Sequence, residues 1–374
     1  MLYMDNSATT RIDPEVVEAM MPYLNEEYGN PSSKYYLLAQ RARQAVEEAR
    51  EKVAALIGCQ PSEVVFTSGA TESNNMIIKG VADYYGKDLD TIITSKVEHP
   101  SVLEPCKYLE TKGFSIYYLN VDRFGRISLN DLSDLLSTKK ALLVSIIWGN
   151  NEIGSLNKIS DIASLCQQHE VFFHTDATQV IGKIKFDFGR IQGIRFLSCS
   201  AHKLFGPKGI GAAIIRKDNF GLRTKLTPLL HGGGQENEYR SGTLAVHNIV
   251  GFGKAAELSL KRIEETERKL KKLEVACRNA LVEKFGEQIF FNNDNVNKIP
   301  GILSFRLKGI NNELFIKKYS EKICVSTGSA CSSSKPSHVL EAIGLNQTGI
   351  RNTIRISLAT NISEEEIIKT IKEL

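Results

Sequence analysis

Short apolar runs alternate with helical segments over most of the chain, and this alternation limits the folds open to it. The runs lie at residues 64–68, 91–95, 115–119, 141–148, 171–175, 196–200 and 211–216. Several are separated by stretches with helical apolar spacing, such as 159–169. Strands that are apolar at nearly every position are covered on both faces. We therefore predict an α/β fold in which helices cover both faces of a mainly parallel sheet.

The pattern changes near Glu257, which indicates a second unit. Residues 255–287 form a long, charged amphipathic segment, and apolar runs at 302–307, 322–328 and 353–358 predict strands beyond it. Near the other end, Asp13 followed by Pro14 is a helix-start signal. We predict a large α/β domain at residues 14–257, a small α+β domain at 258–374 and an N-terminal arm at 1–13.

The composition is that of an ordinary globular protein and argues against several classes of function. The chain is 42% hydrophobic and 24% charged, and its net charge is only +4. This balance gives no support for nucleic acid as a direct ligand. No apolar run approaches the length of a membrane span, the N-terminus lacks a secretory signal, and the 7 cysteines include no CxxC pair. We expect a cytoplasmic protein with reduced thiols that does not bind a membrane.

Polar clusters follow several of the predicted strands, at 67–72, 98–100, 149–154, 174–179 and 200–203. Ligands of parallel α/β sheets bind at the carboxyl ends of the strands, so we expect these clusters to face one cleft. In the first cluster, residues 68–71 join a strand to a helix. Their glycine and the helix amides suit a phosphate, and an ordinary helix cap without a ligand fits equally well.

Asp176 and Lys203 are the residues that most restrict which ligand the predicted cleft can bind. Asp176 follows an apolar strand, so its carboxylate is either held by structural hydrogen bonds or paired with a cation such as a protonated ring nitrogen. Lys203 closes another apolar run and is followed by the stiff sequence Leu-Phe-Gly-Pro. A surface lysine is the common alternative. Lys203, Asp176 and a phosphate loop all lie at strand ends, and this combination favours a site for pyridoxal 5'-phosphate, with Lys203 as the Schiff-base lysine.

Other candidates each have a structural alternative. His99 either stacks on a cofactor ring and shuttles protons, or is a structural histidine. Asn151 and Gln179 suit a ring hydroxyl and nearby substrate atoms. Cys331 lies in a polar loop of small residues, which favours an exposed, reactive thiol over the buried, inert one that is usual. Arg355 either clamps a carboxylate or forms a surface ion pair. No metal site is predicted.

These residues lie in motifs that together resemble the cysteine desulfurases of the NifS/IscS-like branch. That branch belongs to the fold-type I, class V aminotransferase-like enzymes that depend on pyridoxal phosphate. The resemblance runs from Tyr3 to about Leu358. Its motifs are TSGATESNN (67–75), EHPSV (98–102), NNEIG (150–154), HTDATQ (174–179), SAHK (200–203), HGGGQE (231–236), RSGT (240–243) and STGSAC (326–331).

The resemblance implies a role for each matching residue near the cofactor ring. Lys203 would carry the cofactor and act as the base once substrate has replaced it. His99 would stack on the ring, and Asp176 would pair with the ring nitrogen. Gln179 and Asn151 would contact the ring oxygen or the substrate.

The resemblance also implies how phosphate and substrate are held. Arg355, together with Asn151, would bind the substrate carboxylate. Thr243 would reach the phosphate of the neighbouring subunit, which implies a homodimer with composite active sites. Within one subunit, the phosphate contacts would come from Ala70, Thr71, Ser200, Ala201 and His202.

The implied activity is that of a cysteine desulfurase: L-cysteine becomes L-alanine, and Cys331 keeps the sulfur as a persulfide for an acceptor protein. That acceptor would serve iron–sulfur cluster assembly, tRNA thiolation or DNA phosphorothioation. Two alternatives stay open. Cys331 argues against a selenocysteine or cysteine lyase of the same fold, and the intact Lys203, Asp176 and His99 argue against a non-catalytic sulfur-relay subunit.

The sequence also departs from the family pattern. Ala201 and Ala359 stand where glycine is usual, and alanine is tolerated at 201 if that residue needs no positive φ. The stretch 331–336 is about two residues shorter than in housekeeping members, which affects the reach of the loop. The chain ends at Leu374, whereas those members continue into a tail implicated in docking the iron–sulfur scaffold. We therefore expect a dedicated acceptor.

Overall fold

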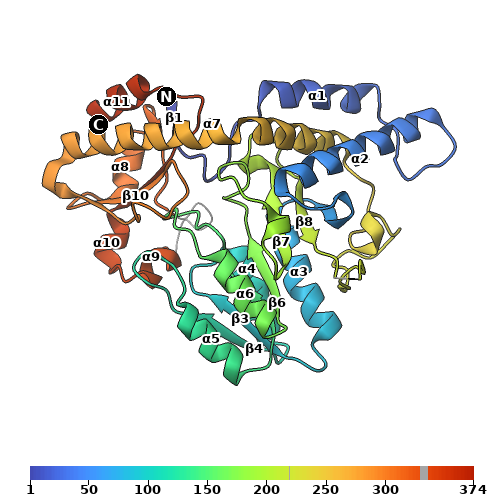
Figure 1. Ribbon diagram of the computed structural model, residues 1–374. Coiled ribbons are helices and arrows are strands. Elements are labelled where there is room, and N and C mark those ends of the chain that lie inside the picture. Colours follow the sequence, from blue (N-terminus) through green and yellow to red (C-terminus); the bar gives the residue numbers. More distant parts are fainter. Residues whose placement is uncertain (219, 329–335) are drawn as a thin grey trace.

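The computed structural model describes residues 1–218, 220–328 and 336–374 and confirms the predicted α/β fold (Figure 1). Its main sheet has seven strands in the order β2-β8-β7-β6-β5-β3-β4. Strand β8 runs antiparallel to both of its neighbours, and the other adjacent strands are parallel. The bounds are β2 Val64–Thr67, β3 Thr91–Ser95, β4 Ser115–Leu119, β5 Ala141–Ser145, β6 Phe172–Asp176, β7 Ile194–Ser200 and β8 Gly211–Ile215.

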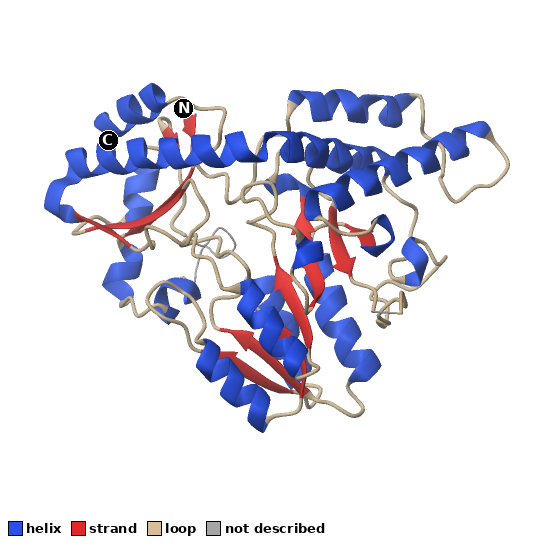
Figure 2. Cartoon of the chain, viewed as in Figure 1, coloured by secondary structure: helices blue, strands red, loops and turns tan. Residues whose placement is uncertain are grey.

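Helices cover both faces of this sheet, as the alternating apolar runs predict (Figure 2). Along β8, Ala212 and Ile214 belong to one buried cluster, and Ala213 and Ile215 belong to another. Successive side chains of a strand point to opposite faces, so the two clusters lie on opposite sides of the sheet. The first cluster includes α2 (Leu37–Ile57), α5 (Leu129–Thr138), α6 (Ile159–Gln168) and part of α7 (Val246–Phe285); the second includes α3 (Ala70–Tyr85) and α4 (Pro100–Glu110).

Helix α7 connects this sheet to a second core. It has 40 residues and begins at Val246, earlier than the predicted segment 255–287. Its first part, through Leu258, packs in the core of the main sheet, and its part from Leu270 onward packs in the second core. Figure 1 shows α7 running across both parts of the molecule. The predicted boundary at 257/258 falls inside this helix, and the division into domains stays a prediction.

The second core contains a three-stranded antiparallel sheet in the order β12-β10-β9. The predicted strand at 322–328 is shorter than expected: it forms only the two-residue β11, which pairs with β1 at the N-terminus. The remaining bounds are β1 Leu2–Tyr3, β9 Ile289–Phe291, β10 Ile302–Leu307, β11 Ile323–Cys324, β12 Thr353–Ser357, α1 Pro14–Asn25, α8 Asn312–Lys318, α9 His338–Ala342, α10 Gln347–Arg351 and α11 Glu364–Lys372.

The N-terminal arm ties the second core to the main sheet. The Asn6 side chain donates to the carbonyl of Ser357, at the end of β12, over 2.9 Å. A few residues on, the Thr10 amide donates to the carbonyl of His202, just beyond β7. The arm therefore crosses the carboxyl ends of the central strands. In the described part of the chain, no helix is long and apolar enough to cross a membrane.

Candidate active site

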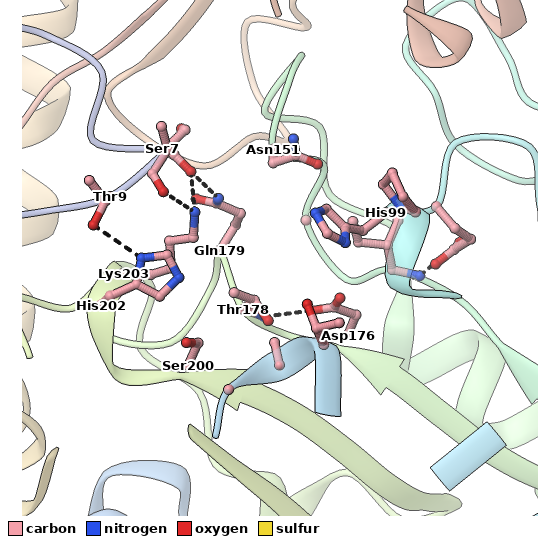
Figure 3. Close-up of a pocket in the computed structure, with 18 of the residues that line it drawn as sticks. Ser7, Thr9, His99, Asn151, Asp176, Thr178, Gln179, Ser200, His202 and Lys203 are labelled. Atoms are coloured by element: carbon pink, nitrogen blue, oxygen red, sulfur yellow. Dashed lines mark hydrogen bonds between the residues drawn. The ribbon is translucent and has the colours of Figure 1, made fainter. Parts of the chain in front are cut away.

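The carboxyl ends of the central strands open onto a cavity of about 450 Å³ (Figure 3). Most of the candidate residues line it, although they come from segments far apart in the chain. Ala201 is buried and does not line the cavity, Thr243 is exposed outside it, and Cys331 lies outside the described residues. The candidates that line it are Ala70, Thr71, His99, Asn151, Asp176, Gln179, Ser200, His202, Lys203 and Arg355.

Lys203 enters the cavity from the turn that follows β7. Its ammonium group donates to the backbone carbonyls of Ser7 and Ala8, the latter over 2.7 Å (Figure 3). The turn is held by the Ala201 carbonyl, which accepts from the amides of residues 204 and 206. Ala201 has no positive φ, so alanine fits where the family pattern has glycine. The sequence singled out Lys203, but it did not identify the arm carbonyls that hold it.

Asp176 lies at the end of β6 and is 4% exposed. One carboxylate oxygen accepts from the Thr178 amide over 3.0 Å, and the other accepts from the Asn74 side chain over 2.8 Å. Both carboxylate oxygens are therefore hydrogen-bonded, as a buried polar group requires. The carboxylate thus lies fixed at the wall of the cavity, where it can pair with a cationic group.

His99 is the N-cap of α4, and this position fixes its tautomer. Its Nδ1 accepts from the backbone amide of Ser101 over 3.1 Å. A backbone amide can only donate, so Nδ1 carries the lone pair and the proton of the neutral ring is on Nε2. Burial lowers the pKa of His99, and the nearby Lys203 lowers it further, against the opposing effect of Asp176. His99 is therefore neutral at pH 7 and presents a donor at Nε2.

One hydrogen-bonded chain connects His99 to Asp176. Asn74, on α3, donates both to Asp176 and to the hydroxyl of Ser101, over 2.8 Å in each case. The Ser101 hydroxyl lies 2.8 Å from Nδ1 of His99. Sequence analysis missed Asn74 and Ser101, although both lie inside motifs that it quoted. Their signal is their position near the start of the helices that follow two of the strand ends: Ser101 is the second residue of α4, and Asn74 is the fifth residue of α3.

The first turn of α3 forms the end of the cavity suited to an anion. Gly69, its N-cap, has a φ of 150° and provides no side-chain cap for the amides of the first turn, whose residues Ala70 and Thr71 line the cavity. Gly211 lies so close that a Cβ there would be 2.7 Å from the Gly69 Cα, which requires glycine at 211. His202 lies nearby, and burial and the adjacent Lys203 lower its pKa to about 4. The ring is thus a neutral hydrogen-bonding group at pH 7.

Arg355 closes the opposite side of the cavity from β12 and is 1% exposed. Its guanidinium donates to the carbonyls of Asn151 and Gly328, over 3.0 and 2.8 Å. It also pairs with the carboxylate of Asp5 over 2.7 Å. Its Nε is buried and has no hydrogen-bond partner among the described residues. Arg355 therefore forms an ion pair, as one of the two expectations had it, but a buried one that fixes the guanidinium beside the cavity.

Glu98 is a buried carboxyl next to His99 that the sequence did not single out. Its Oε1 accepts from the Ser95 hydroxyl and from the Ile147 amide, the latter over 3.0 Å. Burial raises the pKa of Glu98 to about 8, with a smaller contribution from the charge of Asp176. Glu98 is therefore protonated at neutral pH.

The raised pKa of Glu98 predicts a specific pH dependence of stability. The folded protein keeps this proton up to about pH 8, whereas the unfolded chain releases it near pH 4.5. In that window the unfolded state binds fewer protons, so the contribution of Glu98 to the free energy of unfolding falls as pH rises, by roughly 1.4 kcal/mol per pH unit. Glu98→Gln cannot ionise, so the free energy of unfolding of this variant should lack the part of the pH dependence that Glu98 causes.

Denaturant unfolding at pH 5 and pH 8 tests this expectation. Glu98→Gln should gain stability relative to the wild type on going from the lower to the higher pH. Glu104→Gln is the matched control, because Glu104 is exposed on α4 and pairs with Lys107. A stability difference between wild type and Glu98→Gln that is the same at both pH values would contradict the assignment.

Comparison with known proteins identifies the family. The model of the family described as Aminotransferase class-V matches residues 2–369. A cysteine desulfurase IscS from Dictyoglomus turgidum is 43% identical over 377 residues, covering 100% of this chain and 93% of that protein. The chain belongs to the cysteine desulfurases of the class V aminotransferase family. An IscS from Buchnera aphidicola is 41% identical and covers 99% of this desulfurase and 91% of its own length.

Solved structures agree with this assignment. A NifS-like protein superposes on the desulfurase with a TM-score of 0.92 at 38% identity, covering 100% of this chain and 97% of its own. A structure described as SspA in complex with cysteine has a TM-score of 0.84 at 35% identity, and the match covers 96% of this chain and 99% of that one. DndA from Streptomyces lividans has a TM-score of 0.82 at 32% identity, and the match covers 94% of this chain and 98% of that one. The cofactor of this family, and of this desulfurase, is pyridoxal phosphate.

The residues of the cavity fit this cofactor. Buried polar atoms without partners among the described residues gather in its lining: the hydroxyls of Ser7 and Thr178 and the Nε of Arg355. Such atoms are rare in folded proteins and indicate a polar ligand. A primary amine, a buried carboxylate and a helix N-terminus meet in the same space, and they match the aldehyde, ring nitrogen and phosphate of pyridoxal phosphate.

Proposed function

We propose that this desulfurase converts L-cysteine to L-alanine and keeps the sulfur as a persulfide on Cys331. The observation that carries the proposal is the meeting of Lys203, Asp176 and Arg355 at one cavity. The first two suit the cofactor. The third supplies a buried cation with an unpartnered donor, which suits the carboxylate of an amino-acid substrate.

Within this proposal, each side chain of the site has a defined role. Lys203 would hold the cofactor and later remove or return the proton at the substrate Cα. Asp176 would keep the ring nitrogen protonated, and the first turn of α3 would hold the phosphate. When bound, pyridoxal phosphate supplies an electron sink that stabilises negative charge at the substrate Cα. His99, with its proton on Nε2, would exchange protons with groups above the ring.

Sulfur transfer would then occur between two thiols. The thiolate of Cys331 would attack the sulfur of the bound cysteine, forming an S–S bond while the Cβ–S bond breaks. The electron pair of that bond stays on carbon, which takes up a proton, so the products are alanine and the persulfide of Cys331. The atoms balance without an external oxidant or reductant.

The acceptor and the assembly are also part of the proposal. The IscS relatives and the SspA and DndA structures leave iron–sulfur assembly, tRNA thiolation and DNA phosphorothioation as candidate destinations. We propose a cytoplasmic homodimer in which Thr243 reaches the partner's phosphate site. Thr243 lies exposed, outside its own subunit's cavity, which supports this arrangement. Sedimentation of the purified protein as a 41.6 kDa monomer at working concentration would contradict it.

The deciding experiment measures alanine and protein-bound persulfide from L-cysteine in the wild type and in Cys331→Ser. The wild type should form both products. The variant should form no persulfide at residue 331 and lose alanine formation by about 100-fold or more, because the hydroxyl is a poor sulfur nucleophile. Cys324→Ser, on β11, is the matched control and should behave like the wild type.

Two results would redirect the proposal. Equal alanine formation by wild type and Cys331→Ser, with sulfur released as free sulfide, would favour the lyase alternative. No alanine from the wild type in the presence of pyridoxal phosphate would favour the sulfur-relay alternative.

A further inference from the structure

A second lysine lies behind the site, on the turn that follows β6. The ammonium group of Lys183 donates to Oε1 of Gln179 over 2.8 Å. Gln179, which is 4% exposed, donates from Nε2 to the carbonyl of Ser7 over 2.9 Å. Lys203 donates to the same carbonyl. Figure 3 shows Gln179, Ser7 and Lys203 meeting at this point. One continuous chain of hydrogen bonds therefore runs from Lys183 to the Schiff-base lysine.

The chemistry of the ammonium group decides which way the Gln179 amide faces. An ammonium has donors and no acceptor, so only the carbonyl oxygen of Gln179 can face it. The NH₂ group must then point away from Lys183, toward Ser7 and the cavity. Without Lys183, a buried glutamine amide could rotate by half a turn and present its oxygen to the cavity instead. A rotated amide would place its oxygen against the Ser7 carbonyl, and the hydrogen bond from Nε2 to that carbonyl would be lost.

Among the described residues, the charged groups that act on Lys183 are the cations Lys203 and Arg355. Lys203 faces it from the turn after β7, and Arg355 faces it from β12, where Asp5 of the arm pairs with Arg355. Burial lowers the pKa of Lys183 to about 7, and these two cations add to the effect. The charge of Lys183 also contributes to the lowered pKa of His202, which lies beside Lys203. Lys183 is thus a buried amine that donates to Gln179 although its surroundings disfavour its positive charge.

We propose that Lys183 is a positioning residue for the desulfurase reaction: it fixes the Gln179 amide so that Nε2 faces the cavity as a hydrogen-bond donor. The atom it would serve is an acceptor oxygen on the bound cofactor or on the substrate beside Lys203. The inference rests on the proposed placement of pyridoxal phosphate at Lys203. It adds a residue that reaches the reacting groups only through Gln179.

The test uses the absorption of pyridoxal phosphate bound to the holoenzyme. The pH midpoint of its spectral change reports how readily the nitrogen that joins Lys203 to the cofactor loses its proton. Losing a donor to the cofactor oxygen, together with a nearby positive charge, favours the protonated nitrogen. Lys183→Met should therefore raise this midpoint by about one pH unit. Lys183→Arg, which keeps donors and charge, should stay near the wild-type midpoint.

A double-variant comparison separates positioning through Gln179 from a direct charge effect. In a Gln179→Leu background, the shift caused by Lys183→Met should fall to less than half, because the residue through which it acts is gone. Lys185→Met is the matched control, since Lys185 is exposed and pairs with Glu264 on the surface. If Lys183→Met does not fold, Lys183→Leu, which likewise has neither a donor nor a charge, provides the same expected rise.

The outcomes distinguish this inference from the proposed function. An unchanged midpoint in Lys183→Met, or a shift of full size in the Gln179→Leu background, would overturn the positioning role alone. A wild type that takes up no pyridoxal phosphate, or attaches it to a lysine other than Lys203, would overturn the placement of the cofactor and this inference with it. A rise that disappears with Gln179 supports both.

Discussion

Lys203→Ala should abolish covalent attachment of pyridoxal phosphate and lower desulfurase activity by about 10³-fold, within the range for removal of a positioned base. Lys203 emerges from the turn after β7 with its ammonium held by the Ser7 and Ala8 carbonyls. These two carbonyl acceptors hold the side chain in the cavity. Alanine leaves the cavity without the amine that both binds the cofactor and moves the Cα proton.

Borohydride reduction measures this directly, because it converts the C=N bond to a stable secondary amine. Digestion should then recover the cofactor on a wild-type peptide that contains residue 203, and on no peptide of the variant. Lys185→Ala, at an exposed ion pair, is the matched control and should retain both the label and the activity. A labelled peptide containing Lys183 or Lys208 in both proteins would show that another lysine carries the cofactor.

Local patterns were sufficient to predict the main sheet and the positions of Lys203 and Asp176. Each lies at the end of a strand whose apolar run is visible in the sequence, and parallel strands bring their carboxyl ends to one edge. The prediction was poorer where structure depends on distant pairing. Strand β11 is only two residues long because its partner, β1, belongs to the short N-terminal arm.

The supporting groups of the site could not be predicted, for two physical reasons. The acceptors that hold Lys203 are backbone carbonyls of residues 7 and 8, and carbonyls leave no mark in a sequence. The network of Asn74, Ser101 and Asp176 joins three elements, so its members are recognised only when the fold brings them together. Lys183 could not be predicted for the same reason, because nothing in the local sequence distinguishes it from the exposed Lys185.

Arg355→Lys should raise the KM for L-cysteine strongly and lower kcat/KM by about 100-fold, which corresponds to roughly 2.7 kcal/mol. The planar guanidinium of Arg355 donates to two carbonyls, pairs with Asp5 and still has Nε without a partner among the described residues. An ammonium has a different geometry and cannot satisfy the three acceptors while presenting a donor to a carboxylate. The loss should therefore fall on substrate binding more than on the chemical step.

Cysteamine, which is cysteine without its carboxylate, separates substrate binding from general damage to the site. Its affinity, followed by the spectral change of the bound cofactor, should differ little between wild type and Arg355→Lys, whereas the affinity for L-cysteine should differ by the full factor. Arg351→Lys, at an exposed position on α10, is the control and should change neither. Equal losses for the two ligands would mean that Arg355 supports the cavity through Asp5, Asn151 and Gly328. The carboxylate of the substrate would then be bound elsewhere, because a direct ion pair cannot be lost without discriminating between ligands that do and do not carry its partner.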